Sequence, residues 1–131
     1  MHKEWDTLAL CDRFFDALES GDYDTLEACY APECVVWHSH DMLYQSRASN
    51  LAMLKQGMAT HKKMHFTDRR VNAFEGGFVQ QHRLYVTRAN DYTGYMDVCF
   101  IAYTRDGMIK RVYEYFDTSK AEQFTGVPLP A

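Results

Sequence analysis

The chain has 131 residues, which predicts one domain over residues 1–131 and leaves no room for a second of ordinary size. Hydrophobic residues make up 47% of it and charged residues 24%, which is typical of a globular protein and excludes a disordered one. The formal net charge of −4 argues against a nucleic-acid-binding protein, because contacts to phosphates need a basic surplus. The basic clusters at 62–63 and 69–70 are predicted to be solvent-exposed.

Cysteine spacing and the N-terminal residues indicate the class and compartment. The four cysteines, Cys11, Cys29, Cys34 and Cys99, form no C-x-x-C motif, so neither a zinc ribbon nor a thioredoxin-type site is expected. The charged N-terminal residues lack the apolar run of a signal peptide, and no stretch approaches the ~20 apolar residues that cross a bilayer. These patterns predict a cytoplasmic protein that does not bind membranes.

Three helices are expected in the first half of the chain. Apolar residues recur every three or four positions over 5–18, which predicts an amphipathic helix that ends at the glycine of residues 20–21. Asp22 is a suitable N-cap for a second, short helix, which Pro32 stops. A third helix is expected over about 46–62, with its apolar residues on one face.

The remaining segments predict a sheet. Residues 34–38 are rich in β-branched and aromatic side chains. After residue 65 the apolar period becomes two, which predicts strands over 71–74, 78–87, 92–104 and 108–116, joined by tight turns. The order is therefore helix, helix, strand, helix and a four-stranded antiparallel meander. That order predicts an α+β fold in which the helices cover one face of a curved sheet.

Nearly the whole chain resembles a known family, the SnoaL-like and ketosteroid-isomerase-like branch of the NTF2-like superfamily. The resemblance is carried by residues 15–26 (FDALESGDYDTL), 30–38 (YAPECVVWH) and 106–117 (DGMIKRVYEYFD). It implies an NTF2-like cone, in which a curved antiparallel sheet wraps around three helices and leaves a deep, mostly apolar pocket. It also implies a homodimer that pairs through the outer sheet faces, and no metal or organic cofactor.

The positions that act in the resembling isomerases are changed in this chain. The tyrosine that donates to the oxyanion falls on Phe14, the carboxylate base on His38, and the protonated aspartic acid on Cys99. His38 still provides a group that takes up a proton near neutral pH. A comparison with the dehydratase and dehydrochlorinase members instead matches their histidine to His65 and their helical carboxylate to Glu19.

Alternation along the strands predicts which residues line the pocket, because side chains on one face recur every second residue. The residues predicted in this way to face inward, with His38 taken as the reference on its strand, are Val36, His38, His40, Gln80, His82, Leu84, Tyr95, Asp97 and Cys99. On the last strand, the resemblance implies that Val112, Glu114 and Phe116 face inward. Trp37, Tyr113 and Tyr115 are predicted to face outward, where they suit a dimer interface.

The candidate catalytic residues are His38, Glu114 and His82, with His65 as a further candidate. A carboxylate among apolar groups is disfavoured in its charged form, and a neighbouring imidazole shares or takes the proton. Such a pair is the apparatus of general acid–base catalysis. The candidate substrate-binding residues are Phe14, Val36, Asp41, Gln80, Leu84, Cys99, Val112 and Phe116.

Several of these residues have structural alternatives. Glu114 can instead form an ion pair with Arg83 or Arg111 at the rim, and Asp41 can cap a turn instead of holding His38. His40 is expected to be structural. No metal is predicted, because an H-x-H pattern on a strand is common by chance.

Two functions remain open at this point. The first is a cofactor-independent acid–base enzyme of the isomerase, dehydratase or other lyase type. It would act on a small hydrophobic, ring-bearing molecule, with His38 as the base. The alternative is a non-catalytic protein of the same fold that binds a small hydrophobic ligand or serves in dimerisation. Converging polar groups favour the first, and the loss of the isomerase positions favours the second.

Overall fold

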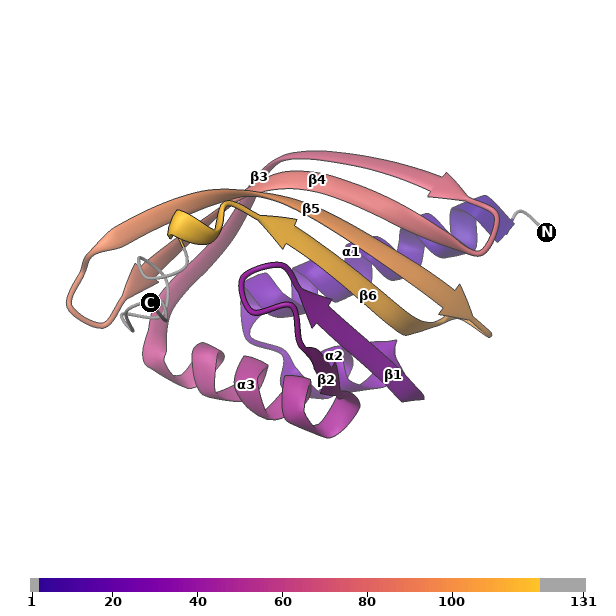
Figure 1. Cartoon of the computed structure of the whole chain (residues 1–131), viewed down its shortest axis with the longest axis horizontal. Helices are drawn as coiled ribbons and strands as arrows, with labels where there is room; N and C mark the ends of the chain where they lie inside the picture. Colours follow the sequence, from indigo (N-terminus) through magenta and orange to yellow (C-terminus); the bar gives the residue numbers. More distant parts are fainter. Residues whose placement is uncertain (1–2, 121–131) are drawn as a thin grey trace.

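The computed structural model describes residues 3–120, which fold into α-helices on one side of a six-stranded sheet (Figure 1). In chain order the elements are α1 (Lys3–Ser20), α2 (Tyr23–Cys29), β1 (Tyr30–His38), β2 (Tyr44–Ser46), α3 (Arg47–Thr60), β3 (His61–Phe74), β4 (Gly77–Arg88), β5 (Thr93–Arg105), β6 (Met108–Phe116) and the 3-10 helix η1 (Thr118–Lys120). The α+β class and the expected order of the helices and long strands are confirmed. No helix among the described residues has the length and apolar character needed to span a membrane.

Local signals set the helix boundaries. Asp22 caps α2 by accepting a hydrogen bond from a backbone N–H of the first turn (3.2 Å), and Ser46 does the same for α3 (3.1 Å). α2 ends at Cys29, so Pro32 is not the residue that stops it. The backbone is already extended at Tyr30. α3 ends at Thr60, short of its predicted end, because β3 begins directly after it.

The strands form one sheet in the order β2-β1-β6-β5-β4-β3. The expected antiparallel pairing holds for every neighbouring pair except β1 and β6, which are parallel. A parallel pair needs a long connection between its two strands, whereas a tight hairpin can join only antiparallel strands. The chain between β1 and β6 is long enough because it contains β2, α3 and three strands of the meander. Besides the parallel pair, three features of the sheet were not predicted: the start of β1 at Tyr30 rather than at residue 34, the short edge strand β2, and the start of β3 at His61, well before residue 71.

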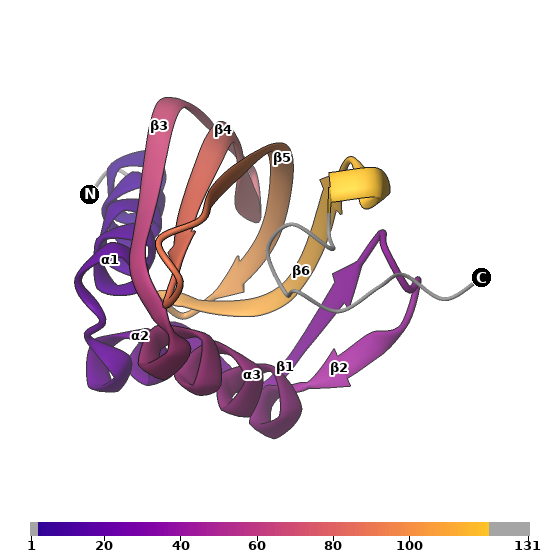
Figure 2. The same ribbon diagram turned by 90° about the vertical axis from the view of Figure 1, so that its left-hand side faces the viewer.

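The sheet curves around the helices, so its concave face is the interior of the molecule (Figures 1 and 2). α1 packs against β3 and β4, and α3 packs against β1. Phe14 and Phe15 of α1 contact Phe100 of β5, with ring centroids 5.5 and 5.1 Å apart. These rings fill the interior that the helices enclose.

The expected deep pocket is not found among the described residues. One hollow of about 440 Å³ lies on the outside of the sheet around Tyr103 and Tyr113, and another of about 930 Å³ lies around Leu10 and the turn that joins β3 to β4. Neither is lined by His38 or Glu114. Large side chains, with Phe14 among the most deeply buried, pack on the concave face.

The inward face of β5 is the opposite of the predicted one. Residues that stand directly opposite each other in an antiparallel pair point to the same side of the sheet. β4 places His82 opposite Val98, and both are buried. The prediction of an inward face is therefore wrong for Tyr95, Asp97 and Cys99. Alternation alone leaves the phase of a strand open, and the cross-strand register fixes it.

A β-bulge interrupts β3 beside the interior. The register with β4 shifts between Thr67 and Arg70, so that Asp68 and Arg69 together oppose His82. Asp68 has a φ of 52°, in the left-handed region, where aspartate is one of the better-tolerated residues. Because of the extra residue, Phe66 and Arg69 both face inward although they are three positions apart, and Nε of Arg69 donates a hydrogen bond to Gln80 on β4.

Candidate active site

His38 and Glu114 form an ion pair on adjacent strands. The parallel register of β1 and β6 places the two residues side by side, next to the buried pair Val36 and Val112. The Nε2 atom of His38 lies 3.3 Å from Oε1 of Glu114. The His38 side chain is 9% exposed and that of Glu114 is 22% exposed. The pair is thus largely buried, while part of the Glu114 carboxylate remains accessible to water.

Each member of the pair shifts the pKa of the other. Burial lowers the pKa of His38, but the hydrogen bond and charge of Glu114, with the charge of Asp41, more than offset it, so this pKa lies above its ordinary value. Burial likewise raises the pKa of Glu114, yet the hydrogen bond and charge of His38 bring it below its ordinary value. The geometry therefore stabilises an imidazolium beside a carboxylate.

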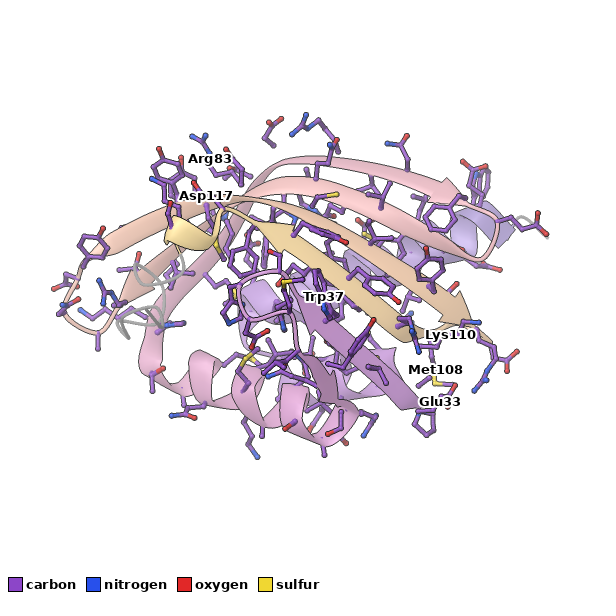
Figure 3. The ribbon with its side chains drawn as sticks, viewed as in Figure 1. Glu33, Trp37, Arg83, Met108, Lys110 and Asp117 are labelled. Atoms are coloured by element: carbon purple, nitrogen blue, oxygen red, sulfur yellow. The ribbon has the colours of Figure 1, made fainter. Side chains whose placement is uncertain are left out.

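The alternative partners of Glu114 are engaged elsewhere. Arg83 lies on the outer surface of the sheet (Figure 3), where its Nε donates to Oδ1 of Asp97 at 2.8 Å. Arg111 donates to the hydroxyl of Tyr113 at 3.0 Å. The alternative of an ion pair between Glu114 and either arginine is therefore wrong.

Asp41 lies in the turn after β1. Its carboxylate accepts a hydrogen bond from the backbone N–H of Leu43 at 3.0 Å, which is the turn-capping alternative. It also lies 3.6 Å from Nε2 of His40, whose ring packs 5.4 Å from the ring of Phe116. Asp41 acts on His38 through its charge and makes no hydrogen bond to it.

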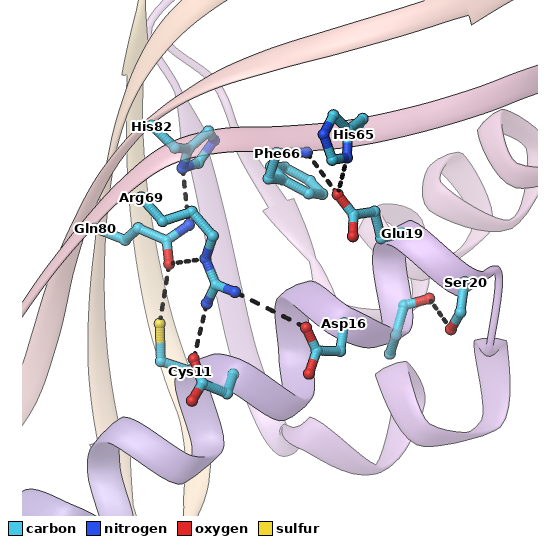
Figure 4. A network of polar contacts seen from close by, with 11 residues as sticks. Cys11, Asp16, Glu19, Ser20, His65, Phe66, Arg69, Gln80 and His82 are labelled. Carbon is cyan, nitrogen blue, oxygen red and sulfur yellow. Dashed lines mark hydrogen bonds and ion pairs between the residues drawn. The ribbon is translucent and has the colours of Figure 1, made fainter.

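His82 belongs to a second polar network in the interior (Figure 4). Its Nδ1 atom lies 2.9 Å from Nε2 of Gln80. The Oε1 atom of Gln80 accepts hydrogen bonds from Nε of Arg69 at 2.9 Å and from the thiol of Cys11 at 3.3 Å. Arg69 is in turn paired with Asp12 at 2.9 Å. The network links α1, β3 and β4 through side chains alone.

The environment of His82 keeps its ring neutral. The residue is 2% exposed, and the rings of Phe15 and Phe66 meet its ring edge to face, at centroid distances of 5.3 and 5.0 Å. Burial lowers the pKa of His82 to about 4; the charge of Glu114 opposes this shift and that of Arg69 adds to it. His82 is therefore an uncharged imidazole at neutral pH.

Arg69 and Cys11 are members of this network that sequence reasoning missed. The expectation that Arg69 is solvent-exposed is wrong, because the bulge in β3 turns its side chain inward until it is only 25% exposed. Three consecutive charged residues, 68–70, directly before the predicted strand over 71–74 were the available signal of an irregularity. Cys11 lies on the apolar face of α1 and gave no signal beyond its burial.

The second candidate pair, His65 and Glu19, also forms. Nδ1 of His65 lies 2.6 Å from Oε1 of Glu19, and the same oxygen accepts a hydrogen bond from the backbone N–H of Phe66 at 2.7 Å (Figure 4). The two side chains are 48% and 36% exposed. This pair lies at the outer edge of the sheet, away from the interior polar groups.

The remaining predicted substrate-binding residues lie in different parts of the molecule. Phe14, Val36 and Val112 are fully buried in the core, and Leu84 and Phe116 are partly buried at its margin. Gln80 makes its hydrogen bonds to Arg69 and His82 within the network described above. The assignment of Cys99 to the site is wrong, because it faces outward on β5. Within residues 3–120, no three His, Cys, Asp or Glu side chains gather as metal ligands do.

Comparisons with solved structures place this fold among known ones. An LEH-like epoxide hydrolase from M. tuberculosis has a TM-score of 0.79 at 15% identity, covering 93% of this chain and 90% of its own. A candidate polyketide cyclase from Xanthomonas campestris pv. campestris has a TM-score of 0.79 at 18% identity, covering 94% and 97%. A protein with a ketosteroid isomerase-like fold from Catenulispora acidiphila, solved with trimethylamine, has a TM-score of 0.76 at 11% identity, covering 92% and 94%.

These similarities establish the NTF2-like, ketosteroid isomerase-like fold. A search of curated proteins gives no match. The family model of the SnoaL-like domain matches residues 11–112, which is well over half of the sequence. The chain therefore belongs to the family of SnoaL-like domains.

Proposed function

We propose that the protein is a cofactor-independent acid–base enzyme of the isomerase, dehydratase or other lyase type, acting on a small hydrophobic, ring-bearing molecule. The observation that carries this proposal is the ion pair between His38 and Glu114, at 3.3 Å, on the inner face of the sheet. Structural neighbours described as an epoxide hydrolase and a candidate polyketide cyclase support an enzyme that processes small molecules.

In the proposed mechanism His38 is the base. Glu114 lies against Nε2 and holds the ring proton there, which leaves the lone pair of Nδ1 to take a proton from the substrate. The imidazolium that forms is stabilised by the carboxylate, as the raised pKa of His38 indicates. The same imidazolium then returns the proton to a different atom of the substrate or to a leaving group. General acid–base catalysis of this kind contributes roughly 10²–10⁴-fold.

The test is a proton-exchange assay that does not require the natural substrate. A panel of cyclic ketones and enones is incubated in D₂O, and the loss of carbon-bound protons is followed by proton NMR. We expect the wild-type protein to accelerate exchange in at least one compound, and His38→Gln to remove that acceleration. Compounds that bind, as judged by line broadening, yet exchange no faster with wild type than with His38→Gln contradict the proposal.

The alternative function, a non-catalytic binding protein, is favoured by one observation. Neither of the two hollows found among the described residues is lined by His38 or Glu114. A binding protein is supported if the panel compounds bind with equal affinity to wild type and His38→Gln and none is exchanged.

We infer that the protein dimerises through the outer face of its sheet. Aromatic side chains form a continuous patch there: Trp37 contacts Tyr115 and Tyr113, and Tyr113 contacts Tyr44 and Tyr103, with ring centroids 5.0 to 6.4 Å apart. Aromatic residues are enriched at such interfaces. Sedimentation should show a dimer at micromolar concentration that Tyr115→Asp dissociates, and a wild-type monomer at that concentration contradicts the inference.

A further inference from the structure

The hollow of about 440 Å³ on the outside of the sheet is lined mainly by cations. Arg105 at the end of β5 and Lys110 and Arg111 on β6 border it, and Glu33 on β1 is the single carboxylate among the described residues of the lining. Figure 3 shows Glu33 and Lys110 at the same end of the sheet, where β1 and β6 begin. Positive charge is therefore concentrated in one hollow of a protein whose net charge is −4.

A β-bulge in β6 places two of these cations on the same face. The register of β6 with β5 skips Lys110, which is the extra residue of the bulge. Ile109 and Val112 are consequently both buried although they are three positions apart. Adjacent side chains on a regular strand point to opposite faces, whereas Lys110 and Arg111 both line the outer hollow. Two like charges held side by side repel each other, and a bound anion would offset that repulsion.

The charge of these two residues is not neutralised by the chain. Arg105 forms an ion pair with Glu33 and also lies 3.9 Å from the carboxylate of Asp106. No carboxylate within residues 3–120 pairs with Lys110 or Arg111. The excess positive charge of the hollow therefore lies on Lys110 and Arg111, where it is available to a ligand.

Neighbouring tyrosines hold the guanidinium of Arg111 in place. Its Nη1 atom donates to the hydroxyl of Tyr113 at 3.0 Å, and its Cζ atom lies 6.0 Å from the ring centres of both Tyr44 and Tyr113. The hydrogen bond occupies one of the five N–H groups of the guanidinium, which leaves the others free to donate to a ligand. Because the group is positioned before a ligand arrives, less entropy is lost on binding.

The size and walls of the hollow indicate a ligand larger than a simple ion. Its volume falls within the range of about 300–1,000 Å³ that is typical of small-molecule sites. The rings of Tyr103 and Tyr113 line it, with centroids 6.2 Å apart. Aromatic walls suit a flat ring, and two cations without carboxylate partners match the charge of a phosphate monoester, which is close to −2 at neutral pH.

We propose that this hollow binds a small molecule that carries a phosphate group on an aromatic ring. Lys110 and Arg111 bind the phosphate, and Tyr103 and Tyr113 contact the ring. The hollow lies on the opposite face of the sheet from the proposed catalytic pair, so this inference does not depend on the proposed function.

The site adjoins the aromatic patch of the inferred dimer interface without coinciding with it. Tyr103 and Tyr113 belong to both, whereas the cations lie outside the patch. Lys110 is five positions from Tyr115 along β6, which amounts to about 16 Å at the rise of a strand. We therefore expect Tyr115→Asp to bind the ligand as wild type does, and loss of binding in that variant overturns the assignment of the site to a single chain.

The first experiment locates the ligand, with phenyl phosphate as the probe. It is titrated into the ¹⁵N-labelled protein at constant ionic strength, and the chemical shifts are followed by NMR. We expect saturable shifts at the Nε–H of Arg111 and at the backbone N–H groups of Lys110 and Tyr103, and none at His38. The absence of a saturable shift at Arg111, or similar shifts at arginines across the whole surface, overturns the proposal.

Two further probes separate the phosphate ester from its parts. Inorganic phosphate has the charge without the ring and should bind about fivefold more weakly, because the contacts with the tyrosines are missing. Benzoate has the ring with a single negative charge and should also bind about fivefold more weakly, because one cation is left without a partner. If inorganic phosphate binds as tightly as phenyl phosphate, the ligand is the free ion; if benzoate does, the site does not select phosphate. Either result overturns the proposed class of ligand.

Substitutions test the two cations. Lys110→Gln should weaken the binding of phenyl phosphate by about threefold, as for an exposed ion pair, and Arg111→Gln by about tenfold, because charge-assisted hydrogen bonds are lost. Lys63→Gln removes another exposed lysine, on β3, and is the matched control that should bind as wild type does. An equal loss in Lys63→Gln and Lys110→Gln indicates general attraction to positive charge and contradicts the proposed site.

The sharpest test is a variant that gains affinity. Glu33→Gln removes the carboxylate from the lining and frees Arg105 from its ion pair. Phenyl phosphate should then bind about threefold more tightly. Glu75→Gln makes the same change of charge in the turn between β3 and β4, outside this hollow, and should leave the affinity unchanged. Unchanged or weaker binding in Glu33→Gln, or an equal gain in both variants, contradicts the proposal.

Discussion

The protein contains two histidine–glutamate pairs that differ in environment more than in chemistry. His65 and Glu19 are the closer pair, at 2.6 Å, yet they are 48% and 36% exposed. His38 and Glu114 are 3.3 Å apart, but only 9% and 22% exposed. A short contact in water stabilises little, whereas a partly desolvated pair changes the proton affinity of both members. Burial, rather than distance, distinguishes the candidate site.

The elements that hold each pair explain this difference. β1 and β6 are interior strands of the sheet, and their parallel register presents His38 and Glu114 together on the concave face. β3 is the edge strand, and Glu19 accepts the backbone N–H of Phe66 there. Unpaired N–H groups on an edge strand need a partner. Glu19 therefore completes the sheet edge, whereas Glu114 has no structural task of that kind.

The largest expected effect separates the two histidines by turnover. His38→Gln should lower the exchange rate by roughly 10²–10⁴-fold, because it removes the proposed base. His65→Gln should leave it near the wild-type rate, and circular dichroism should show that both variants remain folded. The opposite result, an inactive His65→Gln beside an active His38→Gln, assigns the chemistry to His65 and Glu19.

An intermediate effect concerns the pH dependence of His38. Activity should rise with pH through an apparent pKa above the ~6.5 of a free imidazole, because the free base is the active form. Glu114→Gln removes the two largest causes that raise this pKa and leaves the burial that lowers it, with only the smaller effect of the Asp41 charge against it, so the apparent pKa should fall relative to that of wild type. NMR titration of the His38 ring measures both values, with Glu19→Gln as the control. An unchanged pKa in Glu114→Gln shows that the ion pair does not form in solution.

The same pair should contribute to stability only within a window of pH. The raised pKa of His38 means that its contribution is complete below the ordinary histidine value and is lost as the pH rises through the raised value. The lowered pKa of Glu114 means that its contribution is present above the ordinary glutamate value and is lost as the pH falls through the lowered value. Urea unfolding should be measured across this pH range for wild type and Glu114→Gln. The difference in their free energies of unfolding should be greatest at pH values between the lowered pKa of Glu114 and the raised pKa of His38.

The smallest expected effect is at the exposed pair. Glu19→Ala should lower the free energy of unfolding by about 1 kcal/mol, since a partly exposed hydrogen bond to Phe66 N–H is lost. Glu19→Gln keeps an oxygen acceptor and should recover much of that loss in urea unfolding. Equal losses in the two variants indicate that the charge of Glu19, rather than its hydrogen bond, is what stabilises the edge.

Much of the fold follows from local patterns, and what was missed depends on contacts between strands. The apolar periods over 5–18 and 46–62 and the capping residue Asp22 were sufficient to predict all three helices. The face of β5 was predicted wrongly, because an error of one residue in phase reverses every side chain of a strand. Only the pairing of β5 with β4, such as Val98 with His82, settles that phase.

The candidate site was predicted only in part. The resemblance to the family placed His38 and Glu114 on the inner faces of separate strands, and the structure shows that the strands are neighbours in register. The role of Arg69 could not be predicted, because it depends on an irregularity in β3 rather than on residue type.

The bulge in β3 lets two residues that are three positions apart, Phe66 and Arg69, face the interior together. Deleting Asp68 would bring them two positions apart, so regular pleating would leave both on the inner face, with Arg69 directly opposite His82. The deletion would instead remove the bend that a bulge gives to its strand, and with it the local twist of the sheet edge against which α1 packs. The length of β3 therefore sets the curvature of this edge strand more than the side of the sheet on which Arg69 lies.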